Sequence, residues 1–521
     1  MKNRVRHRDG VRGGYGCSEE APGLACAAGR ARVPGRVRVA GGGASLRLPG
    51  VAAVVAMALT AGAGVRHRSG EALATFDDPI QFSVGDYPFA MAAADFDGAG
   101  DEELDGYPDL VVVNSGVNEI FGGDWEELDG TITVFRNTGD WDPPSDGLQV
   151  VQTIMVCSDC VPTDVALADL NGDDYPDLIV AAADRCDSDF YDCSSYGAGV
   201  YTYLWDPDPS ARRFDDTQTN QYYSLAKPVK GLVVADFDGD GLKDVATAVD
   251  SWTNDGAGDV IFVNLNDEEN PGLLLPAETF GLGNSDSPGP STEVVGANFN
   301  RIPVFGQAGV IDILNSYRLH SSLSMSTNDS TPGDLAFDSE RLDDCEDTDA
   351  PDWDFEDMAT ARFHSGSNND DVAAMRADGG IVFIFHGNGD GTFDRDCDGP
   401  PFDDDISITW TGTGGCSPLI LSPAGLDVGH LNGGTKVDIV ATYPGCNQVV
   451  MLLGKGDGTF QLNTSGSAYY IPTKVGSQSA DWPIEVLIVD FDQDGFGDLV
   501  TSNHLTGNIS VMINEMVATN P

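Results

Sequence analysis

The chain has 521 residues and a formal net charge of −55, from 83 acidic against 28 basic side chains. Residues 1–68 hold 12 Lys and Arg against 3 Asp and Glu, whereas the remainder holds 16 against 80. An acidic body of this kind argues against a nucleic-acid partner, because neutralising phosphates requires positive charge. Surface acidity can serve solubility, or it can reflect a salt- or calcium-rich setting, and the composition leaves both readings open.

Residues 1–75 have the composition of a leader and not of a folded domain. A basic flank ending at Arg47 precedes an apolar core over residues 48–63, which closes on Ala61, Gly62 and Ala63. This order is typical of a secretory signal, and the core is short and alanine-rich for a stable membrane span. We therefore expect a secreted, cell-surface or periplasmic protein with an otherwise disordered leader. The alternative is an arginine-rich tail without a targeting role.

Eight of the ten cysteines lie in the acidic body, and an even number suits an oxidising compartment. The simplest assignment pairs near neighbours, although the sequence leaves the connectivity open. These pairs are Cys157–Cys160, Cys186–Cys193, Cys345–Cys397 and Cys416–Cys446. Half a zinc site or a redox pair is the alternative for the first of them, and the lack of a second such spacing favours the disulfide.

Four acidic loops recur along the chain, each between two apolar strands. They begin at Asp95, Asp169, Asp236 and Asp490, and the first carries a six-residue insertion. Each has carboxylate or amide oxygens at positions 1, 3, 5 and 9 and a turn residue at position 6, where Asp174 replaces the usual glycine. Oxygen atoms at these alternating positions of a short loop can coordinate a hard cation. An EF-hand is excluded because Thr247, Thr501 and Val180 stand where its Glu belongs and because the flanks are of β type.

Three looser copies begin at Asn298, Arg362 and His430, so that seven starts follow one another at spacings of 60–74 residues. Asp312 and Asp438 remain at the end of two of them, but Arg362 puts a positive charge at position 1. We expect these degenerate loops to bind no cation. No spacing of two histidines and a carboxylate stands out in the chain.

Seven units of short alternating strands at a near-constant period indicate a closed radial array. The last unit ends near residue 514 without a fourth strand, and an orphan strand over residues 76–84 precedes the first unit. Joining the two would remove both exposed sheet edges. The sequence therefore predicts an all-β fold over residues 76–516, a monomeric seven-bladed β-propeller. Its blades are four-stranded and antiparallel, and the N-terminal strand completes the last blade.

The Asp-Phe-Asp-Gly-Asp-Gly loop at residues 236–241 and the Gly-Asp-Gly-Thr-Phe turns at 389–393 and 456–460 resemble the FG-GAP/VCBS repeat family, the propeller type of integrin α-subunit heads. The resemblance covers residues 76–514. It implies Ca²⁺ bound by side chains at positions 1, 3, 5 and 9 and by the backbone carbonyl at position 7. The four implied sites are Asp95, Asp97, Asp105, Tyr107 and Asp109; Asp169, Asn171, Asp173, Tyr175 and Asp177; Asp236, Asp238, Asp240, Leu242 and Asp244; and Asp490, Asp492, Asp494, Phe496 and Asp498. In the first, Asp101 competes with Asp105 for position 5.

None of the common catalytic signatures is present, neither a nucleophile elbow nor a P-loop, dinucleotide fingerprint or HExxH motif. We expect an exported, non-enzymatic adhesion, ligand-binding or scaffold module in which calcium is structural. The alternative is a lectin or a polysaccharide-degrading propeller. The resemblance implies a protein or glycan partner on the face opposite the calcium loops, where long loops carry aromatic and apolar side chains. These are Ile120, Phe121, Trp125, Phe190, Tyr191 and Tyr196.

A separate Asp-x-Asp-x-Asp-Gly stretch at residues 394–399 is either an extra cation site or a solvated insertion.

Overall fold

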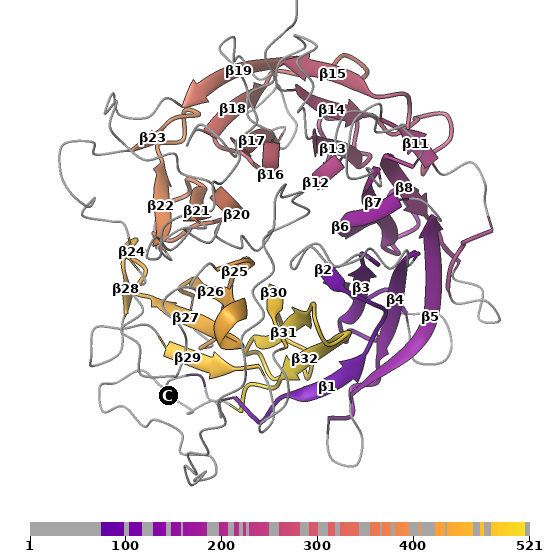
Figure 1. Cartoon of the computed structure of the whole chain (residues 1–521). Coiled ribbons are helices and arrows are strands. Elements are labelled where there is room, and N and C mark those ends of the chain that lie inside the picture. The colour runs from indigo at the N-terminus through magenta and orange to yellow at the C-terminus, as the bar shows by residue number, and fades with distance from the viewer. Residues whose placement is uncertain are drawn as a thin grey trace, which may run out of the picture.

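The computed structural model is a ring of seven antiparallel sheets around a central axis, as the sequence predicted (Figure 1). It describes residues 74 and 76–515, with gaps at 98–103, 117–128, 142–146, 158–159, 185–196, 207–212, 218–221, 226–228, 250–259, 282–290, 301–310, 318–322, 343–354, 365–366, 377–380, 395–405, 408–422, 433–434, 462–468 and 474–480. Helix in these residues is confined to the 3₁₀ turn η1 (Pro444–Cys446), so none of it has the length and apolar character needed to cross a bilayer. The predicted leader lies almost entirely outside the described residues.

Each blade runs from an inner strand at the axis to an outer strand at the rim (Figure 1). Blade 1 contains β2 (Pro88–Ala94), β3 (Asp109–Asn114), β4 (Gly130–Asn137) and β5 (Leu148–Cys157). Blade 2 contains β6 (Cys160–Ala168), β7 (Asp177–Asp184), β8 (Gly199–Tyr203) and β11 (Tyr222–Ser224), with a small hairpin of β9 (Trp205–Asp206) and β10 (Arg213–Phe214) beside it. Blade 3 contains β12 (Val229–Ala235), β13 (Asp244–Val249), β14 (Val260–Asn264) and β15 (Glu278–Gly281).

The remaining blades repeat this order. Blade 4 contains β16 (Ser291–Ala297), β17 (Asp312–Tyr317), β18 (Leu323–Asn328) and β19 (Phe337–Leu342). Blade 5 contains β20 (Phe355–Ala361), β21 (Asp371–Arg376) and β22 (Ile381–Gly387), and both β23 (Phe393–Asp394) and β24 (Ile406–Ser407) pair with β22. Blade 6 contains β25 (Leu426–Gly429), β26 (Asp438–Tyr443) and β27 (Gln448–Gly454), and both β28 (Phe460–Gln461) and β29 (Tyr469–Pro472) pair with β27. Blade 7 contains β30 (Pro483–Val489), β31 (Asp498–Asn503), β32 (Asn508–Met512) and β1 (Ile80–Ser83).

The ring closes through the N-terminal strand, which confirms the prediction for the orphan segment. β1 pairs antiparallel with β32, with Ile80 opposite Val511, and an isolated bridge joins Phe76 to Asn514. In Figure 1 the indigo β1 lies beside the yellow β32. A chain that begins and ends in one sheet leaves neither end of the array as an unpaired edge.

The predicted disulfide Cys157–Cys160 is present, and it joins the end of β5 to the start of β6 and hence blade 1 to blade 2. Cys446 is also disulfide-bonded. The five other cysteines of the acidic body lie outside the described residues, so their pairing stays a prediction.

An aspartate begins the second strand of every blade and holds two segments together. In blade 3, Asp244 Oδ2 accepts the N–H of Phe237 at 2.8 Å, and its Oδ1 accepts the N–H of Asn266 at 2.8 Å. One buried carboxylate thus links the acidic loop to the residues that follow the third strand. The equivalent residues, all with the same two kinds of contact, are Asp109, Asp177, Asp312, Asp371, Asp438 and Asp498.

The residue at position 2 of each loop connects one blade to the next. Its side chain is buried in the core between blades, as with Phe237, and its carbonyl accepts a hydrogen bond from the neighbouring blade in six cases. Asn266 Nδ2 donates to Leu170 O of blade 2 at 2.7 Å and to Lys243 O of its own blade at 3.0 Å. In the remaining case the ring of Trp205 packs on that of Phe96, at 5.1 Å between centroids.

Replacing this inter-blade asparagine should destabilise the protein. Asn266→Ala removes a buried donor from two carbonyl oxygens, and unsatisfied buried acceptors cost about 1–3 kcal/mol. We expect a lower denaturation midpoint in urea at unchanged secondary structure. Asn270→Ala, in the exposed part of the same turn, is the matched control and should stay within about 0.5 kcal/mol of the parent chain. Equal loss in both variants would contradict the inter-blade role.

Candidate metal centres

The four acidic loops share one turn at positions 5–7, stabilised by their own carboxylates. In blade 3 the N–H of Gly241 donates to Asp236 at 3.1 Å and the N–H of Leu242 donates to Asp240 at 2.7 Å. The residue at position 6 has positive φ throughout: Gly106 (+89°), Asp174 (+71°), Gly241 (+99°) and Gly495 (+89°). Asp174 therefore adopts the conformation expected of the residue that replaces glycine there.

In blade 1 the same contacts identify the residue at position 5 despite the insertion. The N–H of Tyr107 donates to Asp105 at 3.0 Å, and the N–H of Gly106 donates to Asp95 at 2.7 Å. Asp105 therefore makes the contacts of position 5, and Asp101 lies outside the described residues.

Blade 7 gathers three carboxylates that could hold a cation. One oxygen from each of Asp490, Asp492 and Asp498 lies within 4.8 Å of the others. Asp490 Oδ1 is buried and receives no hydrogen bond from the described residues. Burial, with Asp492 and Asp490 adding their charge, raises the pKa of Asp498 to about 8. A hard divalent cation would satisfy the buried oxygen and offset the repulsion, so these residues fit calcium.

Blade 3 gathers Asp236, Asp238 and Asp244 in the same way, within 4.8 Å. Burial, with Asp238 and Asp240 contributing, raises the pKa of Asp244 to about 7. Asp238 also accepts the N–H of Gly333 from blade 4 at 2.7 Å, which ties the loop to its neighbour. A cleft of about 380 Å³ beside the loop is lined by Asp236, Lys243, Gly296 and aliphatic residues.

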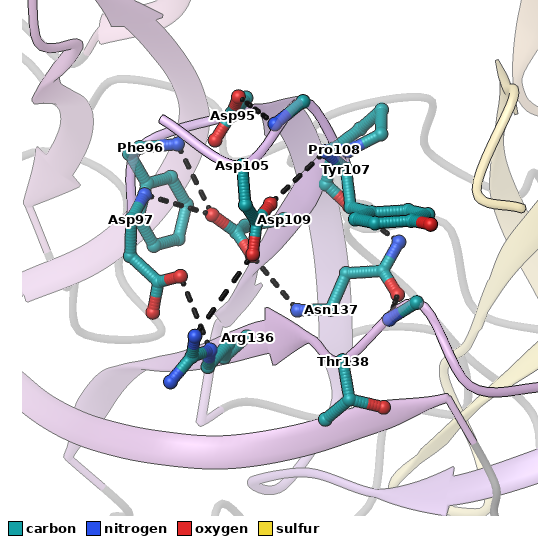
Figure 2. A network of polar contacts seen from close by, with 12 residues as sticks. Asp95, Phe96, Asp97, Asp105, Tyr107, Pro108, Asp109, Arg136, Asn137 and Thr138 are labelled. Atoms are coloured by element: carbon teal, nitrogen blue, oxygen red, sulfur yellow. Dashed lines mark hydrogen bonds and ion pairs between the residues drawn. The ribbon is translucent and has the colours of Figure 1, made fainter. Parts of the chain in front are cut away.

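In blade 1 an arginine lies against the carboxylates. Arg136, the residue before the end of β4, approaches Asp97 Oδ1 with Nε at 3.2 Å and Asp105 Oδ2 with Nη2 at 3.9 Å (Figure 2). By continuation of the strand register it stands opposite Asp109. The guanidinium thus brings positive charge to the place where the resemblance implies a calcium ion.

In blade 2 the loop forms the same kinds of hydrogen bond as in blade 3, and position 3 is the amide Asn171 instead of an aspartate. Asp169 accepts the N–H groups of Gly172, Asp173 and Asp174 at 2.7–3.2 Å, and Asn171 Nδ2 donates to Asp173 at 3.1 Å. Because Asn171 offers an amide oxygen, the described carboxylates of this loop do not form the triad of positions 1, 3 and 9 seen in blades 3 and 7. The expectation of about four calcium sites stays a prediction, and blades 3 and 7 have the geometry that suits it best.

Blade 5 contains a cluster that the sequence reasoning missed. One ligand atom from each of His364, Asp371 and His386 lies within 4.8 Å of the others. The sequence predicts no cation in this loop, and it shows no recognisable spacing of two histidines and a carboxylate. His364 stands at position 3 of the loop, but His386 comes from the far end of β22. The sequence separation of Asp371 and His386 does not predict a contact between them, because they meet only through the pairing of β21 with β22.

The end of the strands opposite the acidic loops carries backbone strain. Three non-glycine residues have positive φ there, namely Tyr87 (+55°), Asn447 (+52°) and Trp482 (+59°). The centroid of the Tyr87 ring lies 5.3 Å from that of the His504 ring, and His504 is buried, with 3% of its surface exposed. Burial lowers the pKa of His504 to about 4, so it is neutral. Strain of this kind concentrates at functional sites.

Several predicted features lie outside the described residues. The six aromatic and apolar residues of the long loops in blades 1 and 2 fall in the gaps at 117–128 and 185–196, and all but the first residue of the 394–399 stretch falls in the gap at 395–405.

Comparison with known proteins adds a fold likeness only. No family model matches the chain, and no curated protein matches it. Among solved structures, the periplasmic gluconolactonase of Pseudomonas aeruginosa is 13% identical and aligns over 73% of this chain and 84% of its own, with a TM-score of 0.41. A likeness this distant says nothing about activity.

Arg136→Leu should create a calcium site in blade 1. Leu265 and Ile513 occupy the equivalent position in blades 3 and 7, so an aliphatic side chain is compatible with the fold. Without the guanidinium, Asp97 and Asp105 lose their positive partner, and we expect one more Ca²⁺ bound per chain in equilibrium dialysis. Arg213→Leu, an equal charge change at an exposed position, should leave the stoichiometry of the parent chain unchanged. An unchanged stoichiometry in Arg136→Leu would refute this role.

Proposed function

We propose that this chain is an exported, calcium-stabilised β-propeller that works as a non-enzymatic ligand-binding module. The observation that carries the calcium part is the blade 7 cluster, in which Asp490, Asp492 and Asp498 converge and Asp490 Oδ1 is buried without a donor among the described residues. Calcium accepts six to eight oxygens at flexible geometry and suits such a loop better than magnesium.

Calcium in these loops would be structural. The loop at residues 490–498 lies between β30 and β31, and Phe491 at its second position is buried against blade 1. Phe491 O also accepts hydrogen bonds from Asn137 and Trp141 of blade 1. An ion that orders this loop therefore also orders the contact between the last and first blades, and its binding free energy adds to the free energy of unfolding.

The proposed ligand face is the one opposite the calcium loops. Tyr87 and Trp482 precede the inner strands of blades 1 and 7, and Asn447 Oδ1 accepts the N–H of Trp482 at 3.0 Å from blade 6. Positive-φ residues of three adjacent blades thus lie at this end of the strands. Tyr87, which is half-buried, is the aromatic among them that solvent can reach, because Trp482 is 7% exposed and packs in the core. Aromatic anchors of this kind are common at binding surfaces, for a protein or a glycan alike.

Calcium should raise the melting temperature of the full chain, and EDTA should lower it by several degrees. A site filled at 100 times its Kd adds about 2.7 kcal/mol. The double variant Asp240→Asn and Asp494→Asn keeps the hydrogen-bond acceptors of the loops but removes one charge from each, so most of the calcium-dependent shift should disappear. Asp390→Asn, in an exposed turn of blade 5, should keep the full shift. Identical melting in calcium and EDTA would overturn the proposal.

Ligand binding should depend on the strained aromatic at the opposite face. The labelled chain is applied in calcium to arrays of immobilised glycans and of extracellular-matrix proteins, and we expect binding to at least one probe. Tyr87→Gly should weaken that binding at least tenfold. Gln493→Gly relieves a similar positive φ of +59° on the calcium face and should not weaken it. Binding to a glycan would favour a lectin, and binding to a protein would favour an adhesion module. No binding on either array would count against a binding module.

A further inference from the structure

Blade 5 holds the same loop framework as blades 3 and 7 but a different set of donor atoms. Asp371 starts β21 and accepts the N–H of Phe363 at 2.9 Å and the N–H of Gly387 at 3.0 Å. The carboxylate is therefore fixed in place, with 2% of its side chain exposed. Two imidazoles face it: His364 Nδ1 lies 3.8 Å from Oδ2, and His386 Nδ1 lies 3.8 Å from Oδ1.

Two substitutions distinguish this cluster from the oxygen ligands in the loops of blades 3 and 7. At position 3, His364 replaces the aspartate that blades 3 and 7 have there, Asp238 and Asp492. Opposite the fixed aspartate, His386 replaces the aliphatic Leu265 and Ile513. Apart from these two substitutions, the loop lacks the carboxylate of position 1, because Arg362 stands there and its Nε pairs with Asp370 at 2.7 Å.

The neighbouring blade holds the two rings close together. Their centroids are 4.5 Å apart at an interplanar angle of 76°. Gly458, in the turn after β27 of blade 6, approaches both rings, and its N–H donates to Phe363 O at 3.3 Å. A Cβ at this glycine would collide with His364 and His386. The turn thus packs directly on the cluster and limits how far the rings can move apart.

This donor set discriminates between metals. Calcium requires six or more oxygens, whereas imidazole nitrogen suits zinc and the other borderline first-row metals. The His364 side chain is 39% exposed and that of His386 17%, so solvent can reach the cluster. Three protein ligands with a solvent-accessible side are typical of zinc sites that keep one position for water.

We propose that His364, Asp371 and His386 bind a borderline divalent transition metal, with Zn²⁺ as the representative ion, at the place in blade 5 where other blades bind calcium. The site is separate from the proposed calcium sites and does not depend on them. It also distinguishes blade 5 within the ring as the blade whose loop takes nitrogen ligands.

Metal titration of the full chain tests this site. The protein is stripped with EDTA, returned to excess Ca²⁺ and titrated with Zn²⁺ by calorimetry and with Co²⁺ by visible absorption. We expect one Zn²⁺ that calcium does not displace, and the d–d bands of a low-coordinate Co²⁺ site. His386→Leu introduces the residue found opposite the aspartate in blades 2, 3 and 6, and His364→Asn introduces the residue found at position 3 in blades 2, 4 and 6, so both variants should fold. Each should weaken Zn²⁺ binding at least tenfold and abolish the Co²⁺ bands.

His430→Asn is the matched control, because His430 lies in the blade 6 loop and its Nδ1 contacts Lys436 O at 2.8 Å. It should bind Zn²⁺ and Co²⁺ as the parent chain does. Histidines and cysteines of residues 1–75 are common to every variant, so metal bound there cancels in the comparison. Absence of Co²⁺ bands in the parent chain, or full affinity in His386→Leu with its melting temperature unchanged, would overturn the proposal and leave the calcium proposal untouched.

Discussion

The aspartate at the start of each second strand is the interaction on which the rest of this propeller depends. Its two oxygens accept one N–H from the acidic loop and one from a residue at or just after the end of the third strand, as Asp244 does with Phe237 and Asn266. These bonds place position 2 of the loop in the core between blades, where its carbonyl can receive a donor from the next blade. The same carboxylate is also the most buried member of each metal cluster. The same aspartate carboxylate therefore serves both the packing of the blades and the candidate metal clusters.

The residue opposite that aspartate determines what the loop can hold. Where it is aliphatic and the loop keeps its aspartates, as with Leu265 and Ile513, the carboxylates converge without a positive partner and calcium fits. Where it is Arg136, the guanidinium lies 3.2 Å from Asp97 and brings its own charge. Where it is His386, with a second imidazole in the loop, the cluster suits a borderline metal. One framework thus presents three different sets of charges and donor atoms, set together by the loop residues and by the side chain opposite the aspartate.

Non-glycine residues with positive φ occur at both ends of the strands, Asp174 and Gln493 at the loop end and Tyr87, Asn447 and Trp482 at the other. At the loop end, buried carboxylates hold unfavourable charge that a cation can offset, so binding there converts into stability. At the other end, the ring of Tyr87 lies beside the neutral His504, whose backbone N–H donates to Trp482 O at 3.1 Å. The two ends therefore offer different chemistry, with gathered carboxylates at the loop end and a half-buried aromatic ring beside a neutral imidazole at the other.

The sequence by itself determined the architecture, the blade count, the strand that closes the ring and the loop positions, because each of these depends on contacts within about ten residues or on a regular period. The aspartates at positions 1, 3, 5 and 9 and the left-handed Asp174 belong to this class. Only the tertiary structure decided which loops gather their oxygens and which carry other donors. Arg136 follows Asp109 by 27 residues and His386 follows Asp371 by 15, and these separations vary with the length of the intervening loop. Strand pairing, and not sequence spacing, brings each of them opposite its aspartate, so the chemistry of each loop became apparent only once the register of its blade was known.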